Sequence, residues 1–221
     1  MTRLSPDMTV STIAAELPGA AELFRRAGIS FCCGGNIALS EAARRAGLEP
    51  QDLLAKLQAL ADAAGRDAPE PTPALIDHIL SRYHATHRAE LQWLIPLAQK
   101  VERVHGDHED APIGLAEVLI ALQDDLDAHM TKEEQVLFPM MLQGAGPMIA
   151  HPIAQMRHEH DDTARLLAGV EHAAHGLNLP EGACGSWTAL YTGLRKFTSD
   201  LVAHMHLENA VLFARFDTAT A

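Results

Sequence analysis

The chain has few aromatic residues and lacks the alternating pattern of β-strands. Aromatic residues make up 5% of its 221 residues, and apolar residues as a whole make up 48%. Long stretches lack the alternation of Val, Ile and Thr that half-buried strands show, whereas Ala and Leu are abundant. These absences argue against a sheet and predict an all-α protein. The length is sufficient for one medium domain and one small one.

Positive charge, long apolar runs and cysteine are also scarce. The formal net charge of −12 argues against nucleic acid or an anionic membrane as a main partner. No stretch of about 18 apolar residues could span a bilayer, and residues 1–30 lack the pattern of a secretory signal. Three cysteines, two of them adjacent, do not form a disulfide framework. We therefore expect a soluble cytoplasmic protein in a reducing compartment.

Histidine is abundant instead, and part of it lies in a motif that occurs twice. His129 and Glu133, with Val-Leu-Phe shortly after them, reappear 75 positions later as His204 and Glu208 with the same Val-Leu-Phe. Residues four apart share one face of a helix, about 6 Å apart along its axis. A single pair of this kind is commonly just solvated. The recurrence of residue type and spacing instead indicates a metal site built from two equivalent helical hairpins.

Each copy of the motif is preceded by a further histidine and by an aspartate. His84 and His160 lie 76 positions apart, at matching distances before the two pairs, and Asp125 and Asp200 lie one turn before the paired histidines. Four imidazoles and two carboxylates are too many for one ordinary centre but suit two metal ions, because carboxylates bridge cations and imidazoles bind iron, copper, nickel or zinc. We expect Asp125 and Asp200 to accept the second N–H of the paired imidazoles.

Other histidines lie close to these positions and compete with them. His87 is one turn beyond His84, while His158 and His206 are each two positions from a histidine of the repeat. We assign the ligands from the matched spacing. The neighbouring histidines are expected either to be exposed or to pack around the ligands without binding the metal, with His206 on the surface.

A proline-rich segment divides the chain. Three prolines within residues 69–73 block helix formation and stiffen the chain, so we expect a linker there. Residues 1–68 before it form a small helical domain, in which Ser40 is the expected N-cap of one helix and Pro50 opens another. Residues 74–221 contain four long amphipathic segments. Their short connections predict an up-down-up-down four-helix bundle, with metal ligands on all four segments.

The small domain contains two adjacent cysteines, Cys32 and Cys33, followed by Gly34 and Gly35. Adjacent cysteines seldom form an unstrained disulfide, and the glycines allow close backbone approach or positive φ. The pair is either buried beside a tight turn or acts as redox or iron-transfer thiols. We favour the second interpretation, because two thiols beside two glycines are a poor way to build a core. Cys184 lies alone in a loop, and the sequence does not decide whether it packs or is a reactive thiol.

Taken together, these motifs resemble the RIC family (repair of iron centres, the YtfE/ScdA type) over nearly the whole chain. The resemblance rests on Phe-Cys-Cys-Gly-Gly near the N-terminus, the proline-rich join and the histidine motifs of the bundle. It implies an ScdA-type N-terminal domain and a hemerythrin-like domain with two non-haem iron ions, which an oxide can bridge. Ala214 departs from the Leu-Phe-Pro that the family tends to repeat. The resemblance implies these iron ligands: His84, His129, His160 and His204, with Glu133 and Glu208 as bridging carboxylates.

The resemblance also implies a function, the repair of iron–sulfur clusters damaged by nitric oxide or oxidants in a bacterial cytoplasm. The expected partners are damaged iron–sulfur proteins or scaffold proteins, and small molecules such as nitric oxide or oxygen. Two rivals remain open at this point. One is a nitric oxide reductase or peroxidase that takes electrons through Cys32 and Cys33, and the other is a carrier or sensor of oxygen or nitric oxide. Whether the protein is an enzyme is therefore left undecided.

Overall fold

The computed structural model describes residues 4–31, 35–144 and 146–217. Within these ranges the chain is mostly helical, and its one β-type pairing is an isolated bridge between Thr9 and Ala38. The prediction of an all-α fold is therefore confirmed. No helix in the described ranges combines the length and apolarity that crossing a membrane requires. The described part of the N-terminal region contains four helices: α1 (Val10–Glu16), α2 (Ala20–Arg26), α3 (Leu39–Arg45) and α4 (Pro50–Ala63).

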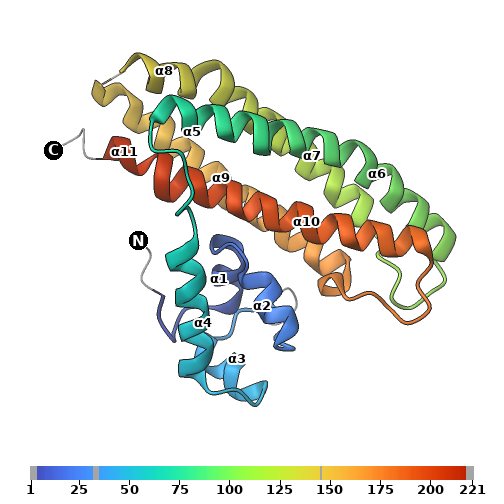
Figure 1. Cartoon of the computed structure of the whole chain (residues 1–221). Helices are drawn as coiled ribbons and strands as arrows, with labels where there is room; N and C mark the ends of the chain where they lie inside the picture. Colours follow the sequence, from blue (N-terminus) through green and yellow to red (C-terminus); the bar gives the residue numbers. More distant parts are fainter. Residues whose placement is uncertain (1–3, 32–34, 145, 218–221) are drawn as a thin grey trace.

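Four long helices follow and lie side by side as an antiparallel bundle, which confirms the predicted architecture (Figure 1). Each is made of several helical elements in direct succession. The first long helix comprises α5 (Thr72–Ile79), η1 (Leu80–His84) and α6 (Ala85–His105); the second, α7 (Leu115–Lys132), η2 (Glu133–Leu137) and α8 (Phe138–Gln143); the third, η3 (Gly146–Ile149) and α9 (Ala150–Ala173), with η4 (His175–Leu177) after it; the fourth, α10 (Gly185–Leu207), η5 (Glu208–Leu212) and α11 (Ala214–Asp217).

The bundle is held together by apolar stripes with helical spacing. On α7, Leu115, Leu119, Leu122 and Leu126 recur every three or four residues, and each is at most 1% exposed. This spacing places them on one face, which packs against the other long helices. Continued along the helix, the same face reaches His129 and then η2. The sequence therefore places polar residues of the repeated motif where leucines would otherwise fill the core.

The N-terminal region has an apolar core of its own, to which Val10, Phe24, Leu39 and Leu57 contribute side chains that are 0% exposed. The prediction that Ser40 is an N-cap is wrong, because α3 already begins at Leu39. The bridge to Thr9 holds the preceding residue extended, and the Leu39 N–H donates to the Met8 carbonyl (2.8 Å). A tertiary contact thus sets the start of this helix.

The proline-rich segment is hydrogen-bonded to the C-terminal end of the fourth long helix. Arg215 of α11 donates one hydrogen bond to the Pro69 carbonyl (3.0 Å) and another to the Thr72 hydroxyl (3.1 Å). The helix α5 begins at Thr72, one residue before the expected end of the linker. Pro73 is compatible with this start, because the N–H that proline lacks has no partner within the first turn of a helix.

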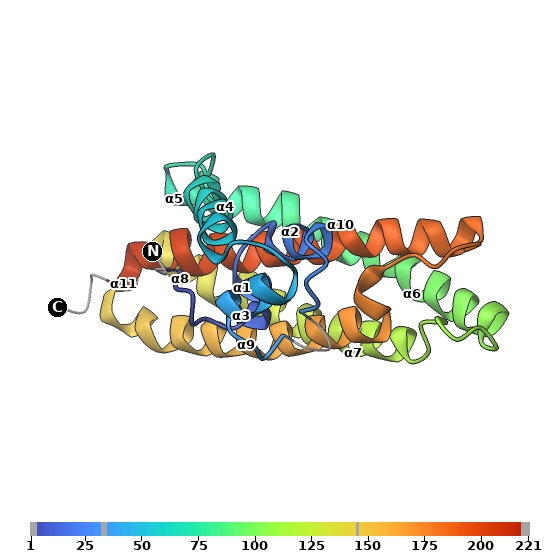
Figure 2. The same ribbon diagram turned by 90° about the horizontal axis from the view of Figure 1, so that it is seen from below.

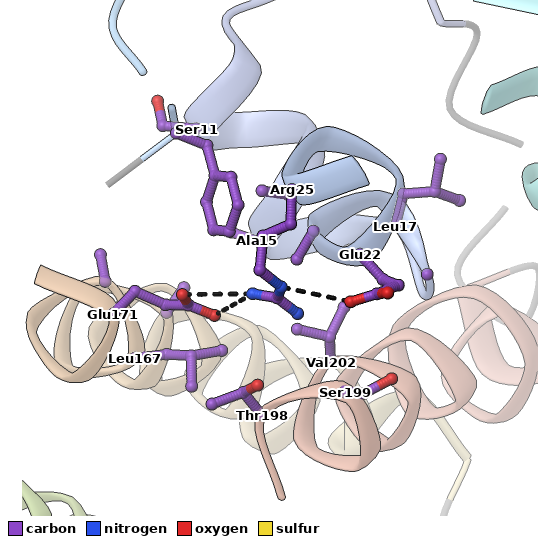
Figure 3. Close-up of a pocket in the computed structure, with 16 residues that line it drawn as sticks. Ser11, Ala15, Leu17, Glu22, Arg25, Leu167, Glu171, Thr198, Ser199 and Val202 are labelled. Atoms are coloured by element: carbon purple, nitrogen blue, oxygen red, sulfur yellow. Dashed lines mark hydrogen bonds and ion pairs between the residues drawn. The ribbon is translucent and has the colours of Figure 1, made fainter. Parts of the chain in front are cut away.

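The N-terminal region lies across α9 and α10, as the view from below shows (Figure 2). Arg25 of α2 forms an ion pair with Glu171 of α9, in which one Arg25 nitrogen, Nη1, donates to both carboxylate oxygens at 3.0 and 3.3 Å. The two side chains are only 9% and 5% exposed, and the dashed lines in Figure 3 mark the contacts between them. Closer to the repeated motif, the His206 Nδ1–H donates to the Glu16 carbonyl (3.2 Å). His206 is therefore covered in part by the N-terminal region, contrary to the expected surface position.

Candidate metal centre

Three of the four long helices widen into a π-helical turn where the repeated residues lie. The first such turn, η1, ends at His84, while η2 begins at Glu133 and η5 begins at Glu208. A π-turn inserts an extra residue into the helix and is frequent at functional sites. The repeat seen in the sequence is thus accompanied by a repeated local distortion of the backbone.

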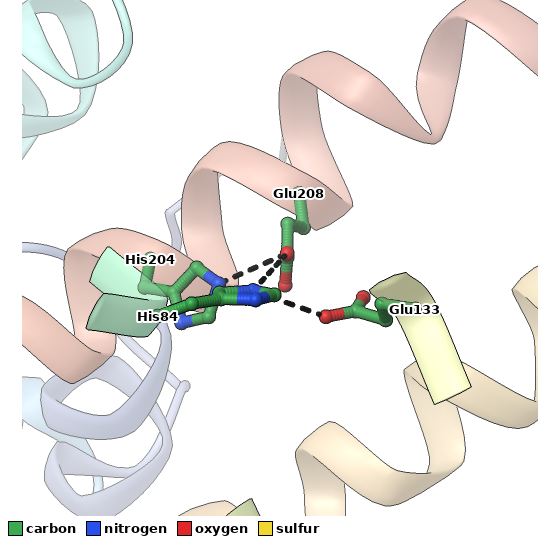
Figure 4. Close-up of side chains that lie close together, drawn as sticks. All are labelled: His84, Glu133, His204 and Glu208. Carbon is green, nitrogen blue, oxygen red and sulfur yellow. Dashed lines mark hydrogen bonds and ion pairs between the residues drawn. The ribbon is translucent and has the colours of Figure 1, made fainter. Parts of the chain in front are cut away.

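The structure brings the six residues of the repeat together in the bundle core. They form two groups of four side chains, each with ligand atoms within 4.8 Å of one another, and Glu133 and Glu208 belong to both groups. Figure 4 shows the group in which His84 and His204 turn toward the Glu208 carboxylate, with Glu133 facing them from another helix. We refer to the six residues as the ligand cluster: His84, His129, Glu133, His160, His204 and Glu208.

Every imidazole of the ligand cluster turns its Nε2 atom toward the shared carboxylates. The Nε2 atoms of His204 and His160 lie 2.9 and 3.1 Å from the two oxygens of Glu208. Those of His84 and His129 each lie 3.4 Å from the same oxygen of Glu133. Four nitrogens and two carboxylates converge from four helices, which is how helical bundles form dinuclear sites.

The burial of the ligand cluster fits a bound cation. Its side chains are between 0% and 4% exposed, and neither carboxylate oxygen of Glu133 has a hydrogen-bond partner among the described residues. A buried carboxylate without a partner is costly, and coordination to a metal removes that cost. Imidazole nitrogen and carboxylate oxygen form a mixed donor set that iron accepts. The residues present therefore fit two metal ions that share two carboxylates.

The electrostatics of the cluster point the same way. Burial and the nearby Glu208 carboxylate raise the pKa of Glu133 to about 7. The pKa of Glu208 is well below its usual range, because His204 and hydrogen bonds from the surrounding imidazoles outweigh the effect of burial. Burial also opposes the charging of His84, but Glu133 and Glu208 outweigh it and raise the His84 pKa to about 10. Two buried carboxylates thus repel each other and attract positive charge.

On its outer side, the His84 imidazole is held by a residue that the sequence analysis missed. Its Nδ1–H donates to a carboxylate oxygen of Glu134 (2.8 Å), and Arg88 donates to the same oxygen (2.7 Å). Glu134 directly follows Glu133 at the π-turn. One turn of the second long helix therefore provides both a candidate ligand and the hydrogen bond that orients another.

The second group has two such outer contacts. The His129 Nδ1–H donates to Glu159 (3.1 Å), whose carboxylate also accepts a hydrogen bond from Lys132 (2.7 Å). The His160 Nδ1–H donates to the side-chain oxygen of Asn209 (3.0 Å). Glu159 and Asn209 were also missed. Asn209 could have been found, because it follows Glu208 as Glu134 follows Glu133.

The expected contacts of Asp125 and Asp200 are not those in the structure. Asp125 accepts a hydrogen bond from the Thr163 hydroxyl (2.8 Å), and Asp200 is paired with Arg82 (2.9 Å) and Lys196 (2.7 Å). Each aspartate lies one turn along the same helix from its histidine. The outer edges of the anchored imidazoles instead point across to neighbouring long helices, so the partners come from there.

Of the two places expected for the neighbouring histidines, His87 takes the one beside the ligand cluster. His87 is 0% exposed, and its ring centroid lies 5.3 Å from that of His204 and 5.5 Å from that of Phe197. Burial lowers the pKa of His87 to about 2, so the ring is neutral. His158 is exposed, as expected. A spacing of three residues places His87 on the same helix face as His84, which is why it too is buried.

The cysteines Cys32 and Cys33 lie outside the described residues. The neighbouring Gly35 is described, and its backbone runs close to other groups: a Cβ atom there would collide with the Phe31 carbonyl and lie 2.8 Å from the Ser11 Cβ. The expected close backbone approach is therefore present at Gly35. Cys184 precedes the first residue of α10, and its sulfur lies 3.1 Å from the His105 Nε2 atom.

Comparisons with known proteins agree with this geometry. Residues 75–216 match the hemerythrin HHE cation binding domain, and residues 6–61 match ScdA_N, a domain of unknown function. The chain is 46% identical over 212 residues to the iron-sulfur cluster repair protein YtfE of Pectobacterium carotovorum, covering 95% of this chain and 96% of the relative. The proteins of the same name from Yersinia pseudotuberculosis and Citrobacter koseri are each 42% identical, with the same coverage. The chain therefore belongs to the YtfE family of iron–sulfur cluster repair proteins.

Proposed function

We propose that the ligand cluster holds two non-haem iron ions and that the chain uses them to repair iron–sulfur clusters damaged by nitrosative or oxidative stress. One observation carries this proposal: Glu133 and Glu208 are fully buried, and each belongs to both groups of ligand atoms. Carboxylates in this position would hold both cations and offset their charge. The substrate class is inferred from the names of the relatives, and the metal is inferred from the match to the hemerythrin domain.

In this proposal the protein provides orientation and shielding from bulk water. Bound iron would supply redox chemistry and open positions for small ligands such as nitric oxide or oxygen. Glu134, Glu159 and Asn209 fix three of the four imidazoles through their outer nitrogens, so that each Nε2 atom faces the cluster. Phe138 stacks on His84 and Phe213 stacks on His160; both rings are at most 2% exposed and keep solvent from the centre.

We assign the role of iron donor to the cluster. A set with four neutral imidazoles and only two carboxylates holds iron less tightly than a set richer in carboxylate, which suits release to a damaged cluster. Cys32 and Cys33 are proposed as thiols that transfer iron or electrons. The division into residues 1–68, a linker at 69–73 and residues 74–221 then separates the thiols from the iron store. The partners are damaged iron–sulfur proteins or scaffold proteins in the cytoplasm.

The test is the recovery of a damaged cluster. A [4Fe–4S] enzyme inactivated by nitric oxide is mixed anaerobically with the iron-loaded chain, and its cluster absorbance and activity are followed. The control receives metal-free chain with the same amount of free ferrous iron. Recovery that requires the loaded chain and consumes its iron supports the proposal. Catalytic consumption of nitric oxide, with iron retained and no recovery of the enzyme, contradicts it.

A further inference from the structure

The two halves of the ligand cluster are not equivalent in their outer contacts. The sequence repeat places Tyr83 and Glu159 at corresponding positions, each directly before the single histidine of its half. Glu159 accepts a hydrogen bond from the His129 Nδ1–H (3.1 Å). Tyr83 instead lies flat against the ring of His204, with centroids 5.2 Å apart and planes 8° from parallel. A stacked ring therefore replaces a hydrogen-bond acceptor in one half.

In consequence, His204 is the least anchored imidazole of the cluster. Its Nδ1 atom is buried and has no hydrogen-bond partner among the described residues, whereas the Nδ1 atoms of His84, His129 and His160 each have one. Besides Tyr83 and His84, the His87 ring lies beside it, and the two nitrogens of His87 also lack a partner there. Stacking restrains the tilt of the His204 ring, but it does not fix the rotation of the side chain about its Cα–Cβ bond.

We infer that the metal position between His84 and His204 is the exchangeable one, from which iron leaves first, while the position between His129 and His160 retains its iron. The inference rests on the proposed function, because it requires that the cluster holds two iron ions. It goes further by assigning the donated iron to one of the two positions.

The physical reason is the contribution of outer hydrogen bonds to metal affinity. An acceptor on the outer nitrogen fixes the orientation of a ligating imidazole and makes it more basic, and its loss typically weakens metal binding about 10- to 100-fold. At the His129–His160 position both imidazoles have such an acceptor. At the His84–His204 position only His84 does, through Glu134. The shared carboxylates contribute to both positions and do not distinguish them.

The direct test is the occupancy of each position in crystals of the iron-loaded protein. Crystals are soaked in a ferrous chelator for increasing times, and anomalous scattering at the iron edge gives the occupancy of the two positions. We expect the occupancy between His84 and His204 to fall first. Equal loss from both positions, or earlier loss between His129 and His160, overturns the inference. Because this test uses the parent protein, it does not depend on whether a variant folds.

Release in solution provides a second test through a single substitution. The parent protein should release one equivalent of iron to the chelator quickly and a second about 10 to 100 times more slowly. Glu159→Ala removes the acceptor from His129 and should accelerate the slow phase, leaving the fast phase unchanged. Glu181→Ala, in the exposed loop before α10, is the matched control and should leave both phases unchanged. A Glu159→Ala protein that keeps the slow phase contradicts the inference.

The outcomes separate the inference from the proposed function. If the parent holds fewer than two iron ions, the proposed function fails and the inference fails with it. If two ions are held and released without preference, only the inference fails. If release is ordered as stated but no damaged cluster recovers, the inference stands and the repair function is overturned.

Discussion

Glu133 and Glu208, 75 positions apart in the sequence, converge in the core of the bundle, where each is 0% exposed and each lies within reach of both pairs of imidazoles. Each also begins a π-helical turn in its own long helix. Two like charges buried together are unfavourable without a compensating cation. The convergence of these two carboxylates is therefore the feature that a dinuclear metal centre explains and a purely structural bundle does not.

The ion pair between Arg25 and Glu171 should contribute strongly to the attachment of the N-terminal region. Arg25→Met leaves the buried Glu171 carboxylate unpaired, which typically costs about 3–5 kcal/mol. We expect urea unfolding to occur at clearly lower concentration in this variant. The double variant Arg25→Met/Glu171→Met should recover most of the loss, since no charge then remains buried.

Arg26 provides the matched control for this substitution. Its side chain is 79% exposed and pairs with the partly exposed Glu22, so Arg26→Met should change the free energy of unfolding by no more than about 0.5 kcal/mol. If Arg25→Met unfolds at the same urea concentration as the parent, the ion pair does not stabilise this contact.

Asp200 should make stability depend on pH in the acidic range. Burial raises its pKa, but hydrogen bonds from Arg82 and Lys196 outweigh this and lower the pKa below its ordinary value of 3.8. The folded state therefore binds this proton less readily than the unfolded state. The stabilisation is complete above the unfolded pKa and is lost as the pH falls through the folded pKa.

The corresponding variant is Asp200→Asn. At pH 7 we expect its free energy of unfolding to be lower than that of the parent by about 1.5–3 kcal/mol, the usual range for hydrogen bonds to charged groups. The difference should narrow as the pH is lowered below about 4, where Asp200 of the unfolded parent becomes protonated. Asp124→Asn, at an exposed position, is the control. A difference that stays constant down to pH 2 would argue against the ion pairs as its cause.

The backbone around Gly35 is so close that we expect no larger residue to fit at this position. An alanine Cβ there would collide with the Phe31 carbonyl, which is backbone and cannot rotate away. We expect Gly35→Ala to destabilise the protein by about 1–3 kcal/mol, as overpacking usually does, measured by urea unfolding. Gly185→Ala is the matched control, because nothing lies within 4 Å of a Cβ at that position. Equal stability of the two variants would mean that the chain near residue 35 rearranges at little cost.

The sequence predicts the ligand cluster well because its signal is local. His129 and Glu133 are one helical turn apart, so the sequence alone places them on one face, and the second copy of the motif repeats that placement. The outer partners Glu159 and Glu134 belong to different long helices from the imidazoles that they hold. Such contacts depend on how the helices are rotated against one another, which spacing within one helix does not specify.

Two other errors have the same origin in tertiary structure. Ser40 has the side chain of a good N-cap, but the bridge between Thr9 and Ala38 starts the helix earlier. His206 was expected on the surface, but its Nδ1–H donates to the Glu16 carbonyl of the N-terminal region, which covers it in part. In both cases the long-range contact outweighs the local preference.

Metal content per chain tests the central claim most directly. The parent protein, Glu133→Ala, Glu208→Ala and the surface control Glu181→Ala are purified anaerobically after growth with iron, and their metals are measured by mass spectrometry. We predict two iron ions per chain in the parent and the control, with clear loss in both variants of the shared carboxylates. A single zinc ion in the parent, or iron content indifferent to both substitutions, would contradict a dinuclear iron centre bridged by Glu133 and Glu208.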